Sequence, residues 1–308
     1  MTRTGVDHFA LGQAHRAAGR LDEAAAEYSQ AIHRADARVA LGETYLALGK
    51  FGAGWALFDE RPGRLAALAA SSWLQAPEWK GEDLTGKRLF VWGEQGHGDE
   101  IFAARYLSDL GAAAVDFSCL PALARLFSQL PVTPWPRPAT MLVHRPDYWI
   151  PSMSLARWCA VPQAMPYLVA PPRSHGGIGI MWRGNALPYP WRSLPPQLGA
   201  ELLALPAARS LDPEDTGATD FLDTAEFIAG LDLVITIDTG VAHLAGAMGK
   251  PTWVLLPTPF PDWRWREGES GFSLHYPSIK LIRQAWPGDW APVVEDVCAR
   301  LRADGLAG

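Results

Sequence analysis

The chain has 308 residues, a hydrophobic content of 48% and a formal net charge of −6 at pH 7, which indicates a globular protein of two or three units. It has no basic tract and no run of about 18 apolar residues, so nucleic acid is a poor candidate partner and no membrane span is expected. The cysteines Cys119, Cys159 and Cys298 are far apart and form no CxxC pair. This spacing argues against structural zinc and disulfides, so we expect a cytoplasmic protein without a signal peptide.

An internal repeat lies within residues 5–61, where Leu11-Gly12 recurs 30 residues later as Leu41-Gly42. Each unit predicts a helix, a glycine-containing turn and a second helix. The pattern resembles tetratricopeptide repeats, although their usual period is 34. Such a unit is either a docking surface for a protein acceptor or a helical cap on the next domain. Two repeats are fewer than the three or so needed to stand alone, which favours the cap.

A connecting segment over 62–88 leads to an expected strand over 89–92, a glycine-rich turn and a helix over 100–110. This order indicates the first βα unit of a Rossmann-like half, although the glycine spacing is not that of a dinucleotide site. Asp99 in the turn is either a general base at a cleft or an ordinary acidic residue favoured by the helix dipole. Glu94 and His97 are further candidates on the same loop.

The rest of the first half is expected to be compact, with strands over 114–119 and 147–151 and helices over 120–130 and 153–159. The stretch 131–146 is too rich in proline for regular structure over its whole length, although 141–144 has the pattern of a strand. An interdomain link is expected near 166–175.

The second half begins with an expected strand over 177–182, followed by a loop that ends at Arg192. Guanidinium suits phosphate oxygens, so an arginine in this loop is a candidate ligand for a phosphate group. Arg192 is the first candidate for that role and Arg183 the second, the alternative being a surface arginine. A strand over 208–211 and a polar loop over 212–220 follow.

The most informative stretch runs from Asp223 to Pro257, where the apolar run 233–237 predicts a buried parallel strand. Asp238-Thr239-Gly240 follows, then a helix of small residues and a strand over 252–256. Because ligands bind at the carboxyl ends of parallel strands, the turn is a candidate phosphate seat, with His243 one helical turn away. The alternative is a polar turn that any buried αβ unit needs.

An aromatic loop follows Pro257, in which prolines are expected to exclude helix. Trp263 and Trp265 either form the wall of a sugar pocket or plug an edge of the core. A last strand over 279–282 and a closing helix to about residue 302 complete the pattern.

The run from Asp223 to Pro257 closely resembles the donor-binding segment of GT-B glycosyltransferases in the heptosyltransferase-like family. In that family an Asp-Ser/Thr-Gly-x-x-His turn holds the diphosphate of a nucleotide sugar, a Trp-x-Gly-Asn turn is followed by a basic loop ending in Arg-Ser, and an aspartate after glycine in the first helix takes the acceptor proton. The resemblance implies catalytic roles for Asp99, Arg192 and His243, and donor-binding roles for Trp182, Gly184, Asn185, Ser193, Asp223, Thr224, Asp238, Thr239, Gly240, Asp262 and Trp263.

The implied fold is α/β of GT-B type, with two Rossmann-like lobes facing a cleft behind the helical repeat pair. Its divisions are the repeats at 1–61, a linker at 62–88, an acceptor-side lobe at 89–170 and a donor-side lobe at 171–308. The chain contains no Asp-x-Asp, which agrees with metal-independent transfer of a sugar to a hydroxyl acceptor, on a protein by analogy. A nucleotide sugar is then the co-substrate, and no cofactor is expected.

Two alternatives remain open. The apolar loop at 186–191 favours a catalytically inactive adaptor that binds a protein partner through its helical repeats. A nucleotide-sugar epimerase shares the two-lobed fold, but we would expect more acidic residues converging on the sugar.

Overall fold

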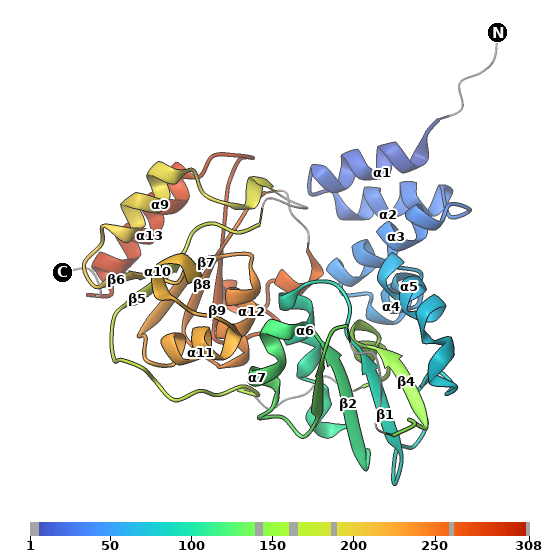
Figure 1. Cartoon of the computed structure of the whole chain (residues 1–308). Helices are drawn as coiled ribbons and strands as arrows, with labels where there is room; N and C mark the ends of the chain where they lie inside the picture. Colours follow the sequence, from blue (N-terminus) through green and yellow to red (C-terminus); the bar gives the residue numbers. More distant parts are fainter. Residues whose placement is uncertain (1–5, 139–143, 160–165, 186–189, 259–261, 306–308) are drawn as a thin grey trace.

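The computed structural model describes residues 6–138, 144–159, 166–185, 190–258 and 262–305. A helical unit at the N-terminus is followed along the chain by two α/β lobes (Figure 1). The strand expected over 141–144 and much of the apolar loop at 186–191 lie outside the described residues.

Two helix–turn–helix pairs form the N-terminal unit: α1 (His8–Ala17), α2 (Leu21–Gln30), α3 (Ala35–Ala47) and α4 (Phe51–Phe58). Gly19 and Gly49 occupy the turns with φ of 73° and 77°, a conformation that glycine adopts without a steric penalty. The small core of this unit is formed around Tyr28 by Ala24, Ala25 and Leu41. The assignment of these helices to the tetratricopeptide repeats stays a prediction.

The first lobe contains a parallel four-stranded sheet in the order β3-β2-β1-β4. Its elements are α5 (Pro62–Ala70), η1 (Ser71–Leu74), β1 (Arg88–Trp92), α6 (His97–Ala104), η2 (Leu107–Asp109), β2 (Ala114–Cys119), η3 (Pro121–Leu123), α7 (Ala124–Phe127), β3 (Thr133–Pro136), β4 (Tyr148–Pro151), η4 (Ser152–Ser154) and α8 (Leu155–Trp158). The helices expected over 100–110 and 120–130 are therefore shorter than predicted. Strand β3 lies in the proline-rich stretch, where its place at the sheet edge tolerates residues that lack an N–H group.

The second lobe contains a parallel five-stranded sheet in the order β6-β5-β7-β8-β9. Its elements are β5 (Ile178–Met181), η5 (Pro190–Arg192), α9 (Pro196–Leu203), β6 (Ala208–Ser210), α10 (Pro213–Thr216), α11 (Phe221–Ala229), β7 (Leu233–Ile237), α12 (Gly240–Ala247), β8 (Thr252–Leu256), η6 (Trp263–Trp265), η7 (Glu269–Gly271), β9 (Ile279–Arg283) and α13 (Ala291–Ala303). All residues of β7 and β8 are buried, as parallel strands covered on both faces require.

Two short helical turns correct the sequence analysis of this lobe. Helix α10 replaces part of the polar loop expected over 212–220, because Asp212 caps the Glu214 N–H at 3.1 Å and Pro213 suits the first helical position. The aromatic loop contains η6, which begins after the prolines, where the Asp262 carboxylate accepts from the Arg264 N–H at 2.9 Å. The expectation that this loop contains no helix is therefore wrong for Trp263–Trp265.

Two parallel sheets with helices against them confirm the α/β prediction, and one hydrophobic core runs through all three parts of the chain. The indole of Trp263 lies at their junction: its ring centroid is 5.1 Å from that of Trp55 in α4, 6.4 Å from that of Phe58 and 5.2 Å from that of Phe102 in α6. The helical unit thus packs on both lobes. None of the described helices is long and apolar enough to span a membrane.

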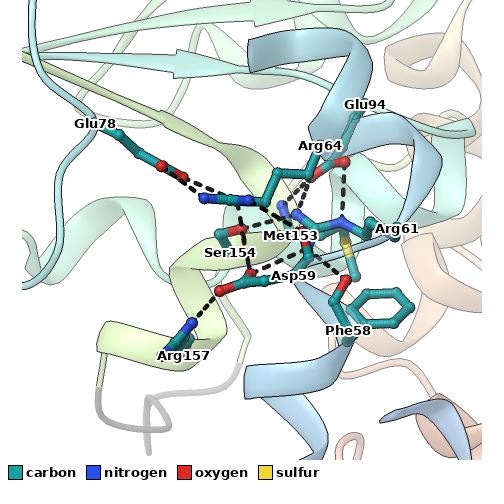
Figure 2. Close-up of polar contacts among 9 residues, drawn as sticks. All are labelled: Phe58, Asp59, Arg61, Arg64, Glu78, Glu94, Met153, Ser154 and Arg157. Carbon is teal, nitrogen blue, oxygen red and sulfur yellow. Dashed lines mark hydrogen bonds and ion pairs between the residues drawn. The ribbon is translucent and has the colours of Figure 1, made fainter. Parts of the chain in front are cut away.

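A buried polar cluster fixes the helical unit to the first lobe (Figure 2). Arg61, which is 2% exposed, donates to both carboxylate oxygens of Glu94, at 3.0 and 2.5 Å, and to Ser154 Oγ at 2.8 Å. Asp59 accepts from Ser154 at 3.2 Å and pairs with Arg157. Glu94 therefore serves this attachment and is withdrawn as a candidate for catalysis.

Candidate active site

A cleft of about 920 Å³ lies between the two lobes. Its walls come from the loops that follow β1, β5, β6, β7 and β8, all at the carboxyl ends of parallel strands, where open α/β sheets bind ligands. Glu43 of the helical unit lines it as well. Asp99 and His243 both line this cleft, as the sugar-transfer hypothesis requires.

Two helices begin at the cleft with their first turns in contact. A Cβ atom on Gly98 of α6 would lie 2.5 Å from Cδ2 of His243 in α12, so this close approach requires glycine. A Cβ atom on Gly240 would lie 3.5 Å from the Cβ of His97. The first N–H groups of a helix have no acceptor within it, and its N-terminus carries a partial positive charge. Two such ends at one point can hold an anionic group.

Arg192 adjoins this pair of helix ends. A Cβ atom on Gly184 would lie 3.0 Å from Thr239 Cγ2 and 3.7 Å from Arg192 Nε, so these residues are neighbours. Arg192 donates to the Asn185 carbonyl at 3.2 Å, and its buried Nε has no hydrogen-bond partner among the described residues. Its charge can therefore be offered to a ligand in the cleft.

Arg183, the second cation predicted for this role, is already neutralised. Its guanidinium lies 2.5 Å from the carboxylate oxygens of both Asp212 and Glu214. An arginine held by two carboxylates contributes little attraction to an anion. The geometry thus favours Arg192 over Arg183.

Both carboxylate oxygens of Asp99 are engaged. Oδ2 accepts from the Gly96 N–H at 3.0 Å, and Oδ1 forms an ion pair with Arg264. Arg264 is bidentate to Asp262, at 3.0 and 2.7 Å, and burial lowers its pKa to about 10, so it remains charged at neutral pH. An attacking hydroxyl would have to displace Arg264 before Asp99 could accept its proton.

Asp238 anchors the turn Asp238-Thr239-Gly240 to the second lobe through its side chain. Its Oδ1 accepts from the indole Nε1 of Trp265 at 2.9 Å. Burial raises the pKa of Asp238. Burial also raises the pKa of Asp262, and the nearby Asp238 carboxylate raises the pKa of Asp262 further. The bidentate contact with Arg264 opposes the rise at Asp262 because it stabilises the ionised form.

His243 lines the cleft as a neutral imidazole. It is 3% exposed, and burial, together with the charge of Arg105, lowers its pKa to about 3. Its Nδ1 lies 3.0 Å from the Tyr276 hydroxyl, and its ring lies 4.6 Å from that of Trp265. When Tyr276 is the donor, the imidazole carries its proton on Nε2. His243 can then offer a ligand one neutral hydrogen bond, but no positive charge.

Of the fourteen residues to which the resemblance gives a role, ten line the cleft: Asp99, Gly184, Asn185, Arg192, Thr224, Asp238, Thr239, Gly240, His243 and Asp262. Four others have different positions. Trp182 packs on α9, where a Cβ atom on Gly199 would lie 2.3 Å from its ring. Ser193 accepts from the Gly184 N–H at 3.1 Å and so supports the turn from behind.

Asp223 and Trp263 are the remaining two corrections. Asp223 accepts from Thr219 and pairs with Arg173 at 2.8 Å and with Arg125 of α7 at 3.4 Å, so it joins the lobes. Trp263 is 4% exposed and belongs to the core. Trp263 is therefore part of the core and does not form the wall of a sugar pocket, which were the two interpretations offered for the aromatic loop.

Sequence reasoning missed five charged residues of the cleft: Glu43, Asp212, Glu214, Asp220 and Arg264. Arg264 follows the strand β8 in the same loop as Asp262, and a basic residue in that place was a usable signal. Glu43 had none, because it comes from a separate unit. Within the described residues, no group of three or more His, Cys, Asp or Glu side chains is arranged to hold a metal ion.

Comparisons with known proteins agree with this location. Residues 209–256, which contain the turn from Asp238 to His243, match the model of glycosyltransferase family 9 (heptosyltransferase). Protein FlbA of Caulobacter vibrioides is 25% identical over 329 residues, which cover 83% of this chain and 53% of FlbA. The chain therefore spans about half the length of this curated relative.

Solved structures show fainter likeness. The iron-containing heptosyltransferase TibC, crystallised with ADP-D-beta-D-heptose, is 11% identical, with a TM-score of 0.46 over 68% of this chain and 66% of TibC. An O-GlcNAc transferase mutant of Thermobaculum terrenum is 15% identical, with a TM-score of 0.28 over 96% of this chain and 84% of its own. The match to a glycosyltransferase family rests on residues 209–256, which contain the turn from Asp238 to His243.

Proposed function

We propose that this protein is a metal-independent glycosyltransferase of GT-B type that moves a sugar from a nucleotide-sugar donor to a hydroxyl acceptor. The observation that carries the proposal is the meeting of two helix N-termini beside Arg192 in an interlobe cleft. These groups stabilise the charge that develops on a departing diphosphate, which is the electrostatic role a metal ion fills elsewhere.

The residues take distinct parts in the proposed reaction. The amides of Gly240 and Val241 and the guanidinium of Arg192 receive the diphosphate, and His243 adds one neutral hydrogen bond. Asp99 accepts the proton of the acceptor hydroxyl as that oxygen attacks the anomeric carbon. Because Arg264 is ion-paired with Asp99, this step requires Arg264 to move. A protein acceptor that docks on the helical unit, and a cytoplasmic location, stay predictions.

Calorimetry with ADP, GDP, UDP and CDP tests the donor site. Removing a charge-assisted phosphate contact by Arg192→Gln is expected to weaken the best-binding nucleotide by roughly 10- to 100-fold. Arg183→Gln is the matched control and should change the affinity little, since Arg183 is already paired. EDTA should have no effect. Absence of nucleotide binding by the wild type, or equal loss in both variants, would contradict the proposal.

The engaged state of Asp99 favours a second candidate, a nucleotide-binding adaptor without catalysis. The two differ in turnover: a transferase releases nucleoside diphosphate from its donor, slowly to water or faster to an acceptor. Binding of the nucleotide sugar with no release over hours would favour the adaptor.

A further inference from the structure

The helical unit reaches the cleft through Glu43 on α3. The Glu43 carboxylate pairs with Arg16 of α1 at 2.7 Å, and its side chain is 32% exposed, so it is held in place and open to a ligand. Helix α3 also packs directly on η6, the segment that carries Arg264. Glu43 is therefore a fixed part of the cleft wall.

Successive contacts define a direction along the cleft. At one end, Phe221 touches the start of α12, since a Cβ atom on Gly240 would lie 2.8 Å from its ring. From the turn, Asp238 is joined through Trp265 to η6. There Arg264 joins Asp262 to Asp99.

Glu43 lies beside the η6 end of the cleft. Its helix α3 packs on η6, and Glu43, Asp262 and Arg264 all line the cleft. The cleft thus runs from Phe221, past the two helix ends, to Glu43.

A nucleotide sugar has its diphosphate in the middle, with the nucleoside on one side and the sugar on the other. This inference rests on the proposed function, in which the diphosphate occupies the helix ends at Gly240. With the nucleoside toward Phe221, the sugar falls at the end walled by Asp99, Asp262 and Glu43. We propose that Glu43, supplied by the helical unit, is a specificity-determining residue that binds the donor sugar.

The charges at this end select the class of sugar. Carboxylates only accept hydrogen bonds when ionised, and sugar hydroxyls donate them. The three carboxylates at this end, those of Glu43, Asp99 and Asp262, outnumber the two guanidinium groups paired with them, those of Arg264 and Arg16. A neutral sugar rich in free hydroxyl groups is matched to this set, and a sugar that carries a carboxylate is repelled.

The test compares each nucleoside diphosphate with its glucose form, using ADP, GDP, UDP and CDP, in the wild type and in Glu43→Gln. For the base that binds best, Glu43→Gln should weaken the glucose form by about tenfold, as expected for loss of a charged acceptor, and leave the diphosphate unchanged. The nucleoside diphosphate glucuronate with the same base should bind the wild type more weakly than the nucleoside diphosphate glucose. Glu43→Gln should reduce this difference in affinity.

Two control variants separate this role from effects on folding. Glu23→Gln changes an exposed glutamate of the same helical unit and should leave all affinities unchanged. Arg16→Gln removes the partner of Glu43 without altering the carboxylate, so it should retain most of the sugar contribution.

The outcomes distinguish the two levels of the hypothesis. If the wild type binds no nucleotide, the proposed function itself fails. If it binds, and Glu43→Gln changes the diphosphate and the glucose form by the same factor, or neither, only the role of Glu43 is overturned.

Discussion

Replacing Arg61 with methionine is expected to destabilise the protein by about 3–5 kcal/mol, the cost of removing one partner from a buried ion pair. Arg61 makes two contacts with Glu94 and one with Ser154, as Figure 2 shows, and donates to the Phe58 carbonyl at 3.3 Å. Methionine retains much of the side-chain volume. Arg61 also lies 3.4 Å from Asp59, but Asp59 keeps Arg157 as a partner. The loss therefore reports mainly the charge of Glu94, which is 4% exposed and would lose its counter-ion.

Urea unfolding followed by the fluorescence of the 14 tryptophans measures this loss. With a slope of about 3 kcal/mol per M, the midpoint should fall by about 1 M or more. Arg34→Met is the matched control: Arg34 pairs with Asp36 at 2.7 Å, but the two side chains are 41% and 51% exposed. Solvent screens that pair, so the midpoint should not move measurably.

A double variant identifies the cause. Adding Glu94→Leu to Arg61→Met removes the uncompensated carboxylate and should restore much of the lost stability, because a buried ion pair is replaced by apolar groups. The buried-pair reasoning is refuted if Arg61→Met shifts the midpoint no more than Arg34→Met. It is equally refuted if the double variant is less stable than Arg61→Met.

Three further outcomes are expected. Gly98→Ala should cost about 1–3 kcal/mol and weaken nucleotide binding, because its Cβ would lie 2.5 Å from His243 Cδ2 and force α6 and α12 apart; thermal unfolding and calorimetry measure both effects. The low folded pKa of His243 means that only the unfolded chain takes up its proton as the pH falls below about 6.5. Between pH 7 and 5 the wild type should thus lose about 2 kcal/mol more stability than His243→Gln, and an equal loss in both would exclude this cause. Burial raises the pKa of Cys119 and Cys159 to about 12, so neither should react with a thiol reagent at pH 8 until the protein is unfolded, as labelling followed by mass spectrometry can show.

Local patterns predicted the parts of the fold that depend on neighbours in sequence. The apolar runs at 233–237 and 252–256 match β7 and β8 residue for residue, because strands buried on both faces need continuous apolar sequence. Helix α10 was predictable as well, since Asp212 followed by Pro213 is a helix-start signal. Strand β3 was not, because its prolines are acceptable only at a sheet edge, and the sequence does not state which strand lies there.

The residues of the site likewise fall into those that local sequence predicts and those that it does not. The turn at Asp238 and the arginine at 192 follow strands of one lobe, so the rule for parallel sheets brought them together. Trp263 was misplaced and Glu43 missed because their surroundings come from contacts between separate units. No pattern within either segment records that α3 and α4 lie against the loop after β8.

The position of Trp263 has a mechanical consequence. The indole of Trp263, which belongs to the second lobe, contacts both the helical unit and the first lobe. It belongs to a hydrophobic core that is continuous through the helical unit and both lobes. Moving the two lobes apart would remove the contacts of that ring and expose the hydrophobic core to water. Ligands are thus expected to enter and leave the cleft through small movements of loops and side chains at its opening. The two lobes are expected to keep their relative position.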